Sequence, residues 1–376
     1  MLLLGVFNFA AALQGLFLAY LLINKKGDQS EYRYLALLVL IVSLSMLGPV
    51  LGISGYYRQL PYLIRVSEPL TLLFGPLLYI YVYVLSEGKP PRLFYLHFLP
   101  FLIYMGALFP FYVLPPAEKI AFVEIQISKK VPNLWAQAIR LVHASIYVFI
   151  SLRQIRSLQQ KLKQAFSDLN KFKLDQSVHI LRSYTIIIAI CFVICMVSLV
   201  HPMDFVVVNN IAALSVGLLI YSLVYVNWSH PVIAPVVLPE QEAIPNQQEP
   251  TDRKRLNYYL SEEQFLKYAD KLETILSEQQ VYLDPELSLN NLSEFLGIPA
   301  YQVSEVINRH YKLSFFDLIN QFRVNEVKKR LINPAYSHFS VLAISMDCGF
   351  NSKSSFNSAF KKITGTTPSE YRKSSS

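Results

Sequence analysis

The sequence predicts an all-α protein in two parts: a bundle of seven transmembrane helices, then a cytoplasmic domain with two helix-turn-helix units joined by a long helix. Two observations support this fold class. The 376-residue chain is 53 % hydrophobic and only 16 % charged, which is too apolar for an ordinary soluble protein. The apolar excess lies before Trp228. After that residue, apolar side chains recur at helical spacing, and turns containing glycine separate the helices.

Seven apolar segments near the length that spans a bilayer, about 20 residues, precede Trp228. They are Leu2–Ile23, Tyr34–Ile53, Tyr62–Leu85, Leu93–Val113, Asn133–Leu152, Tyr184–Met203 and Phe205–Val226. The first segment is not expected to be a signal peptide, because no basic residue precedes it and Lys25 and Lys26 follow it. We therefore expect residues 1–228 to form a seven-span domain.

The charges of the predicted loops orient this domain. Twelve lysines and arginines lie in the loops after the first, third and fifth spans, and four lie in the other loops. Basic residues near span ends accumulate on the cytoplasmic side. This pattern predicts a multi-pass protein of the inner membrane, with its N-terminus outside and its C-terminus in the cytoplasm. The long fifth loop, Arg153–Arg182, predicts a basic amphipathic helix. It would contact anionic lipid, a second copy or the C-terminal domain, or simply be solvated.

A flexible linker is predicted between the two parts, at residues 229–255. His230–Thr251 is rich in proline, glutamine and glutamate, as in extended, poorly ordered tethers. Ser261 with Gln264 three residues later then predicts a capping box at the start of a helix. We expect residues 256–376 to form the cytoplasmic domain.

The segment Asp347–Arg372 predicts a helix-turn-helix unit. A short helix ends at Cys348, Gly349 supplies the turn, and a second helix covers Ser352–Ile363. An isolated pattern of this kind would be an ordinary surface hairpin of helices. The exposed polar side chains of the second helix suit base edges and phosphates. The residues expected to face bases are Lys353, Ser354, Asn357 and Ser358.

A second unit of the same kind lies upstream. Asn290–Leu296 predicts its first helix, Gly297 its turn, and Ala300–His310 its second helix. The predicted base-facing residues are Tyr301, Gln302, Glu305, Asn308 and Arg309. Between the units, Ser314–Leu331 predicts a helix about 27 Å long, close to the separation of two successive major grooves, about 34 Å.

From Glu262 to Arg372 the chain resembles the DNA-binding domain of AraC/XylS-type transcriptional regulators. The ending GF-x-S-x-S-x-F-x-x-x-F-K-K-x-x-G-x-x-P-x-x-Y-R carries the resemblance. The resemblance implies a seven-helix domain that places two recognition helices in successive major grooves of double-stranded DNA. Ser358 and Glu305 depart from the family pattern, because basic residues are common at both positions.

The charge of the chain is compatible with this interpretation. The net charge of +8 suits nucleic acid or an anionic membrane surface equally well. Phosphate contacts make affinity fall with added salt, and a solvated helix face is the plain alternative for each cation. The predicted phosphate partners are Arg323, Lys328, Lys361 and Lys362.

Ionisable and amide side chains within the predicted spans suggest a ligand cavity in the outer half of the membrane, because such residues are costly there. The alternative is that these residues are polar contacts that fix helix packing. The predicted cavity residues are Arg65, Glu68, Arg140, His143 and Asn209.

No motif indicates an enzyme, a cofactor or a metal centre. The favoured hypothesis is a membrane-bound one-component transcription factor that senses a signal ligand and changes promoter binding, for instance through the geometry of a homodimer. One alternative is a transporter or membrane enzyme with a regulatory DNA-binding appendage. Another is proteolytic release of the C-terminal domain.

Overall fold

The protein is helical and divides into two compact units. The computed structural model describes residues 2–24, 30–129, 134–167, 174–200, 205–229 and 260–374. Residues 230–255 of the predicted linker and the pair Lys25 and Lys26 lie outside the described residues. One unit contains Met1–Arg156 and Leu174–Val236, and the other contains Ser157–Lys173 and Val237–Ser376. The prediction of an all-α fold is confirmed.

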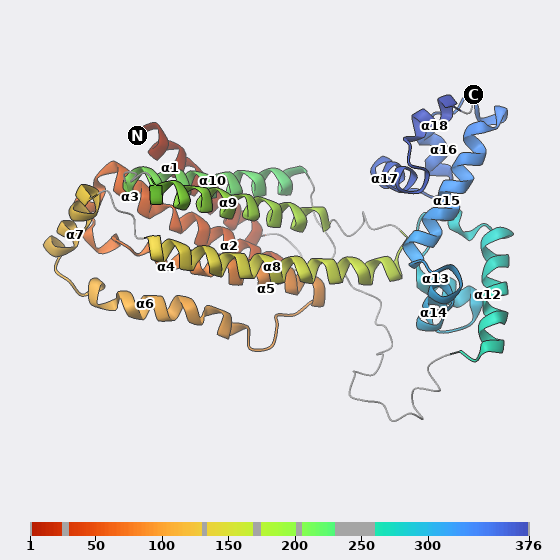
Figure 1. The fold of residues 1–376 in the computed structure, drawn as a ribbon, viewed down its shortest axis with the longest axis horizontal. Helices are drawn as coiled ribbons and strands as arrows, with labels where there is room; N and C mark the ends of the chain where they lie inside the picture. The colour runs from red at the N-terminus through yellow and green to blue at the C-terminus, as the bar shows by residue number, and fades with distance from the viewer. Residues whose placement is uncertain are drawn as a thin grey trace. The chain divides into compact units, whose positions relative to one another are not determined.

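The first unit is a bundle of mostly apolar helices. They are α1 (Leu2–Ile23), α2 (Ser30–Ser45), α3 (Leu47–Ser54), α4 (Ser67–Leu70), α5 (Phe74–Glu87), α6 (Leu99–Tyr112), α7 (Pro116–Lys129), α8 (Leu134–Ala165, up to Arg156 in this unit), α9 (Leu174–Val200) and α10 (Phe205–Ser229). Helix α1 packs against α2 and α10, and α9 packs against α10 (Figure 1). A buried amide pair joins α1 to α10, because Asn8 Nδ2 donates to Asn210 Oδ1 at 3.0 Å.

Six helical stretches among the described residues are long and apolar enough to cross a membrane. They are Leu3–Ile23, Tyr32–Ser54, Pro61–Glu87, Phe94–Tyr112, Trp135–Ala165 and Val178–Ser198. The predicted seventh span coincides with α10, in which the apolar stretch found among the described residues is Val206–Leu218. Seven spans therefore remain a prediction, while six candidates are present in the described part of the chain.

The third predicted span, Tyr62–Leu85, is not one continuous helix. Two short 3₁₀ segments and the single turn α4 precede α5, which begins only at Phe74. Arg65 has a φ of +64°, a left-handed conformation that costs a non-glycine residue about 1–2 kcal/mol. Pro69 and Pro76 lack the backbone N–H that a regular helix needs. The periodicity of apolar residues in the sequence does not reveal these interruptions of the helix.

Helix α7 is an element that the sequence analysis did not anticipate. It lies in the loop between the fourth and fifth predicted spans. Its Phe122 and Val123 pack against a cluster of Tyr57, Ile64 and Phe111. We expected only a loop here, because 14 residues with two glutamates are too short and too polar to be taken for a span.

The second unit contains the C-terminal domain. Its helices are α12 (Glu262–Ser277), α13 (Leu289–Leu296), α14 (Ala300–Tyr311), α15 (Phe315–Ile332), α16 (Val341–Asp347), α17 (Lys353–Thr364) and α18 (Pro368–Ser374). These are seven helices over the described range 260–374, the number that the resemblance implies. The predicted capping box is present, because the Ser261 side chain accepts from the Gln264 N–H at 3.2 Å and Gln264 Oε1 accepts from the Ser261 N–H.

Helix α15 belongs to two hydrophobic cores at once. Its N-terminal half contributes Phe315, Leu318 and Ile319 to a core with α12, α13 and α14. Its C-terminal half contributes Val324 and Val327 to a core with α16 and α17. Burial of side chains of this size stabilises by roughly 1.5–3 kcal/mol each. Each helix-turn-helix unit therefore depends on one half of the same helix.

The end of helix α8 packs within the second unit. The Ser167 hydroxyl donates to the Leu287 carbonyl at 2.6 Å, and Phe166 forms an antiparallel bridge with Ser288. Ser167 is 2 % exposed. Residues 157–167 therefore contact the C-terminal domain, which is one of the partners considered for the fifth loop.

Candidate DNA-binding surface and membrane cavity

The second helix-turn-helix unit is formed by α16 and α17. Gly349 lies in the turn with a φ of +90°, a conformation that glycine adopts without strain. The Ser352 side chain caps α17 by accepting from the Ser355 N–H at 3.1 Å. Phe356 and Phe360 anchor the helix, because both are buried. These contacts fix which face of α17 is left to solvent.

That free face of α17 carries the residues predicted to contact bases. The side chains of Lys353, Ser354, Asn357 and Ser358 are all exposed. Lys361 and Lys362 are exposed on the same helix. Lys362 also forms an ion pair with Asp317 of α15, at 2.7 Å. These exposed side chains are the donors and acceptors that base edges and phosphates require.

The ion pair with Lys362 belongs to the N-terminal cap of α15. Burial alone would raise the pKa of the Asp317 carboxyl, but hydrogen bonds from Lys362 and Ser314 lower it below its ordinary value. The Ser314 side chain in turn accepts from the Asp317 N–H at 3.1 Å. The ammonium of Lys362 therefore helps to stabilise the start of α15. No ion pair is found for Lys361 among the described residues.

The first helix-turn-helix unit differs in its electrostatics. Arg309 of α14 pairs with Glu262 of α12 at 2.7 Å and with Glu305 at 3.1 Å. Its guanidinium also lies 4.0 Å from the centroid of the Phe265 ring. Glu305 accepts from the Leu260 N–H as well, and its side chain is only 12 % exposed. Two of the predicted base-contacting residues therefore hold α14 against α12.

The other residues of α14 that were predicted to contact bases are exposed or half-buried. Asn308 is exposed and donates to the Ser304 hydroxyl at 3.3 Å. Tyr301 and Gln302 are half-buried near the helix start. Compared with α17, helix α14 offers fewer uncommitted polar groups.

Arg323 is placed in the interior of the domain. It is 1 % exposed, and it donates to the Tyr282 and Asp284 carbonyls, each at 2.7 Å. It also donates to the Ser167 hydroxyl at 3.3 Å. Arg323 therefore lacks the exposed guanidinium that the predicted phosphate contact requires. Lys328 is half-buried, with its ammonium 5.7 Å from the Tyr371 ring centroid.

A cavity of about 520 Å³ lies among the helices of the first unit. Of the five predicted cavity residues, Arg65, Glu68, Arg140 and Asn209 line it. His143 is not among the lining residues, and its ring packs 4.9 Å from that of Tyr147. The volume falls in the range typical of small-molecule sites, roughly 300–1,000 Å³.

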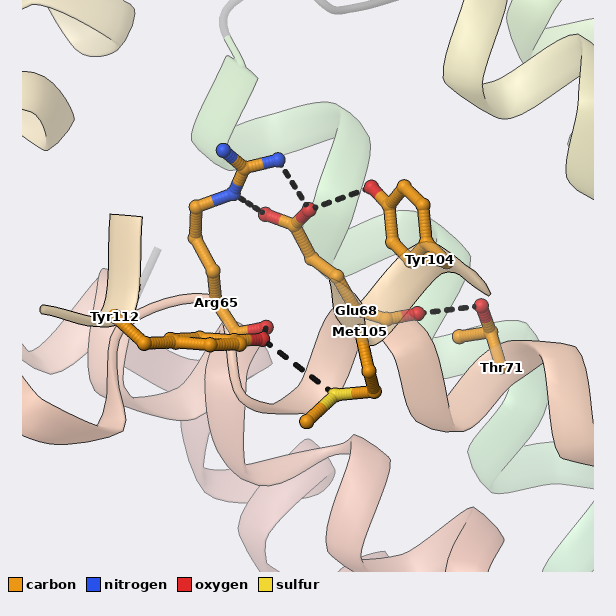
Figure 2. Close-up of polar contacts among 6 residues, drawn as sticks. All are labelled: Arg65, Glu68, Thr71, Tyr104, Met105 and Tyr112. Carbon is orange, nitrogen blue, oxygen red and sulfur yellow. Dashed lines mark hydrogen bonds and ion pairs between the residues drawn. The ribbon is translucent and has the colours of Figure 1, made fainter. Parts of the chain in front are cut away.

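One wall of this cavity is a polar network on the interrupted segment that was predicted as the third span. Arg65 and Glu68 form a bidentate ion pair (Figure 2), in which both N···O distances are 3.0 Å. The Tyr104 hydroxyl donates to the same carboxylate at 3.1 Å. Arg65 also lies 5.2 Å from the ring centroids of both Phe111 and Phe122. The strained backbone of Arg65 is thus held by contacts from α6 and α7.

Sequence reasoning missed several side chains of the cavity. Tyr104 lies in an apolar segment. Its hydroxyl group is the one feature of the local sequence that indicates a polar contact. Gln137 lines the cavity from α8, three residues before Arg140 on the same face. Phe122 comes from the unanticipated helix α7. These residues meet Arg65 only through tertiary packing.

Comparison with known proteins covers the C-terminal domain. A family model described as a helix-turn-helix domain matches residues 292–374. An uncharacterized HTH-type transcriptional regulator of Staphylococcus aureus (strain COL) is 28 % identical over 103 residues. The melibiose operon regulatory protein of Escherichia coli (strain K12) is 31 % identical over 90 residues. The C-terminal domain is a helix-turn-helix domain of the AraC type.

Each of the matches named here covers only part of this chain. The S. aureus alignment covers 27 % of this chain and 13 % of that relative, and the E. coli alignment covers 24 % and 29 %. A solved structure from Listeria innocua, of a protein of unknown function, is 26 % identical and covers 28 % of this chain and 97 % of its own, with a TM-score of 0.25. The chain thus spans less than a third of the length of each curated relative named here.

The AraC-type domain contains a thiol that should be inert. Cys348 is fully buried, and burial raises the pKa of its thiol to about 12. The thiolate is the nucleophile, so a maleimide at pH 7.5 should not label Cys348 in the native protein. Labelling should appear once guanidinium unfolds the domain, and mass spectrometry of the labelled peptide measures it.

This measurement needs a protein in which Cys348 is the sole thiol. Cys191→Ala and Cys195→Ala provide it, because the chain has three cysteines. Ser369→Cys in the same background is the positive control, since Ser369 is exposed on α18. Native labelling of Cys348 as fast as that of the control would contradict the burial described here.

Proposed function

We propose that this protein is a membrane-bound, DNA-binding transcription factor that senses a signal through its first unit and regulates promoters through its AraC-type domain. The observation that carries the proposal is the exposed polar and basic face of α17 within a paired helix-turn-helix domain. Both curated relatives are described as regulators, the E. coli one of an operon.

Membrane residence is supported by the surface of the first unit. Large hydrophobic side chains stay exposed on α1, α8 and α9, for example Phe17 at 62 %, Phe149 at 68 % and Phe192 at 53 %. Soluble proteins rarely expose contiguous apolar surface of this kind, whereas lipid accommodates it. The loop charges then favour the cytoplasmic side for the AraC-type domain.

Coupling between signal and DNA is proposed to run through α8. This helix is continuous from Leu134 to Ala165. Its cavity residue Arg140 belongs to the first unit, and two residues after its end Ser167 contacts Leu287 and Arg323 in the second unit. A ligand that discriminates two states of the first unit would shift this contact.

The docking of this segment can be tested by a cross-link. Residues paired across an antiparallel bridge have Cα atoms about 4.5–5.5 Å apart, within disulfide range. Phe166→Cys with Ser288→Cys, in a chain without other cysteines and with a protease site in residues 230–259, should form a disulfide. After cleavage, the two fragments should migrate together until reduced. Phe166→Cys with Ser369→Cys is the matched control, and equal cross-linking of both pairs would argue against docking.

The function itself is tested by mapping DNA bound to the full-length protein across the genome. We expect discrete sites at promoters, lost in Asn357→Ala while the protein stays in the membrane fraction. An immunoblot of the same cells should show the full-length chain, which separates this proposal from proteolytic release. Absence of any reproducible site would contradict the proposal.

A second candidate is a transporter or membrane enzyme that carries a regulatory DNA-binding domain. The interruption of the third span at Arg65 and Glu68 favours it, because broken helices often form transport sites. However, the Glu68 carboxylate already accepts three hydrogen bonds. Uptake that depends on Glu68 in proteoliposomes, with DNA binding unaffected, would favour this candidate.

A further inference from the structure

We propose that the cavity of the first unit binds an amphipathic anion, with its carboxylate or phosphate headgroup on Arg140. This inference names the ligand class and rests on the proposed sensor function for its biological meaning. Binding itself can be measured independently of DNA.

Among the residues that the structure describes, those lining the cavity carry one uncompensated positive charge. They include two arginines, Arg65 and Arg140, and one carboxylate, Glu68. The oxygens of Glu68 accept both hydrogen bonds from Arg65 and one from Tyr104 (Figure 2). Arg140 makes no hydrogen bond or ion pair with any residue that the structure describes. Its charge is therefore available to a ligand.

An unpaired arginine in this position is energetically unfavourable. Charged side chains in spans normally pair with one another or with backbone carbonyls. Arg140 is half-buried, seven residues into α8 and on the cavity side. An arginine remains protonated in any protein environment, so it cannot remove the cost by losing its proton. A bound anion would remove that cost.

Neutral donors accompany this cation. Gln137 lies one turn before Arg140 on α8, and Asn209 faces the cavity from α10. Neither side chain makes a hydrogen bond with a described residue. Amide N–H groups and a guanidinium together match the oxygens of a carboxylate or phosphate.

The rest of the lining is suited to an apolar body. Helix α9 contributes Ile187, Ile188 and Ile194, and α10 contributes Val206 and Val216. A small inorganic anion would leave this wall uncovered, and an amphipathic cation would be repelled by Arg140. An anionic headgroup on an acyl-like chain satisfies both surfaces.

The test uses dodecanoate as the probe, below its micellar concentration, with full-length protein in a neutral maltoside detergent. Dodecanol and dodecylamine are the matched neutral and cationic probes. Arg140→Gln should weaken dodecanoate binding about tenfold or more, and Arg140→Lys should weaken it less, because it keeps the charge. Dodecanol should bind wild type and Arg140→Gln equally, which also shows that the variant is folded. Equal affinities for all three probes, or full dodecanoate binding by Arg140→Gln, would overturn the proposal.

A competition experiment with lipids identifies the source of the anion. Nanodiscs of phosphatidylcholine, with and without phosphatidylglycerol, show whether an anionic lipid competes with dodecanoate. Competition assigns the site to a lipid headgroup, and its absence assigns it to a free amphiphile. The wild-type protein is also mapped on the genome. Dodecanoate binding by the wild type without any promoter site would contradict only the proposed function, and promoter sites without dodecanoate binding would contradict only this inference.

Discussion

Replacement of Gly349 by alanine is expected to unfold the second helix-turn-helix unit. Any L-residue at its φ of +90° costs about 1–2 kcal/mol. An added Cβ would also lie 2.6 Å from the Tyr282 carbonyl oxygen and 2.9 Å from that of Leu283. Backbone atoms cannot rotate away, and forced repacking costs about 1–3 kcal/mol more. We expect a total loss of about 2–5 kcal/mol, measured by urea unfolding of the full-length protein in detergent.

Gly365 provides the matched control. Its φ is +78°, but a Cβ there would meet no atom within 4 Å. Gly365→Ala should therefore show the conformational cost alone, about 1–2 kcal/mol. The difference between the two variants isolates the close approach of α15 and residues 282–283 to the turn. Equal losses would mean that this approach is not as tight as described.

Substitutions on α17 should separate base reading from phosphate binding. Asn357→Ala is expected to cost about 1–3 kcal/mol of affinity for a mapped promoter site and to relax the preference at one base pair. Lys361→Ala should weaken all sequences alike and lower the slope of log affinity against log salt by about 1. Fluorescence anisotropy between 50 and 200 mM salt, the range over which phosphate contacts are resolved, measures both.

Lys267→Ala is the control for these substitutions. Lys267 is exposed on α12, outside both helix-turn-helix units. Its removal lowers the net charge by the same amount as Lys361→Ala. If Asn357→Ala and Lys361→Ala changed binding no more than Lys267→Ala does, α17 would not face DNA.

The elements predicted well are those set by local sequence. The capping box at Ser261, the turn at Gly297 and the bounds of α15 follow from residues within one or two turns of each other. Most of the predicted apolar segments likewise coincide with long helices, because length and hydropathy define them.

The features that were not predicted depend on distant residues. Arg323 is buried because carbonyls about 40 positions away accept its hydrogen bonds. The third span is interrupted where Arg65, in a left-handed conformation, meets aromatic rings from α6 and α7. The sequence around a basic residue on a helix, or around an arginine in an apolar segment, is the same whichever distant residues it contacts. Such contacts therefore cannot be predicted from the local sequence.

The pairing of Arg309 with Glu262 and Glu305 predicts that the two recognition helices of the AraC-type domain contribute unequally to DNA recognition. Two of the five residues that α14 was predicted to offer to bases, Glu305 and Arg309, are engaged in ion pairs at the α12 side, while the corresponding residues of α17 are exposed. Sequence discrimination should then come mainly from the half of the operator that faces α17. The other half should tolerate base changes, so an alignment of target sites should show one sharply defined block beside a degenerate one.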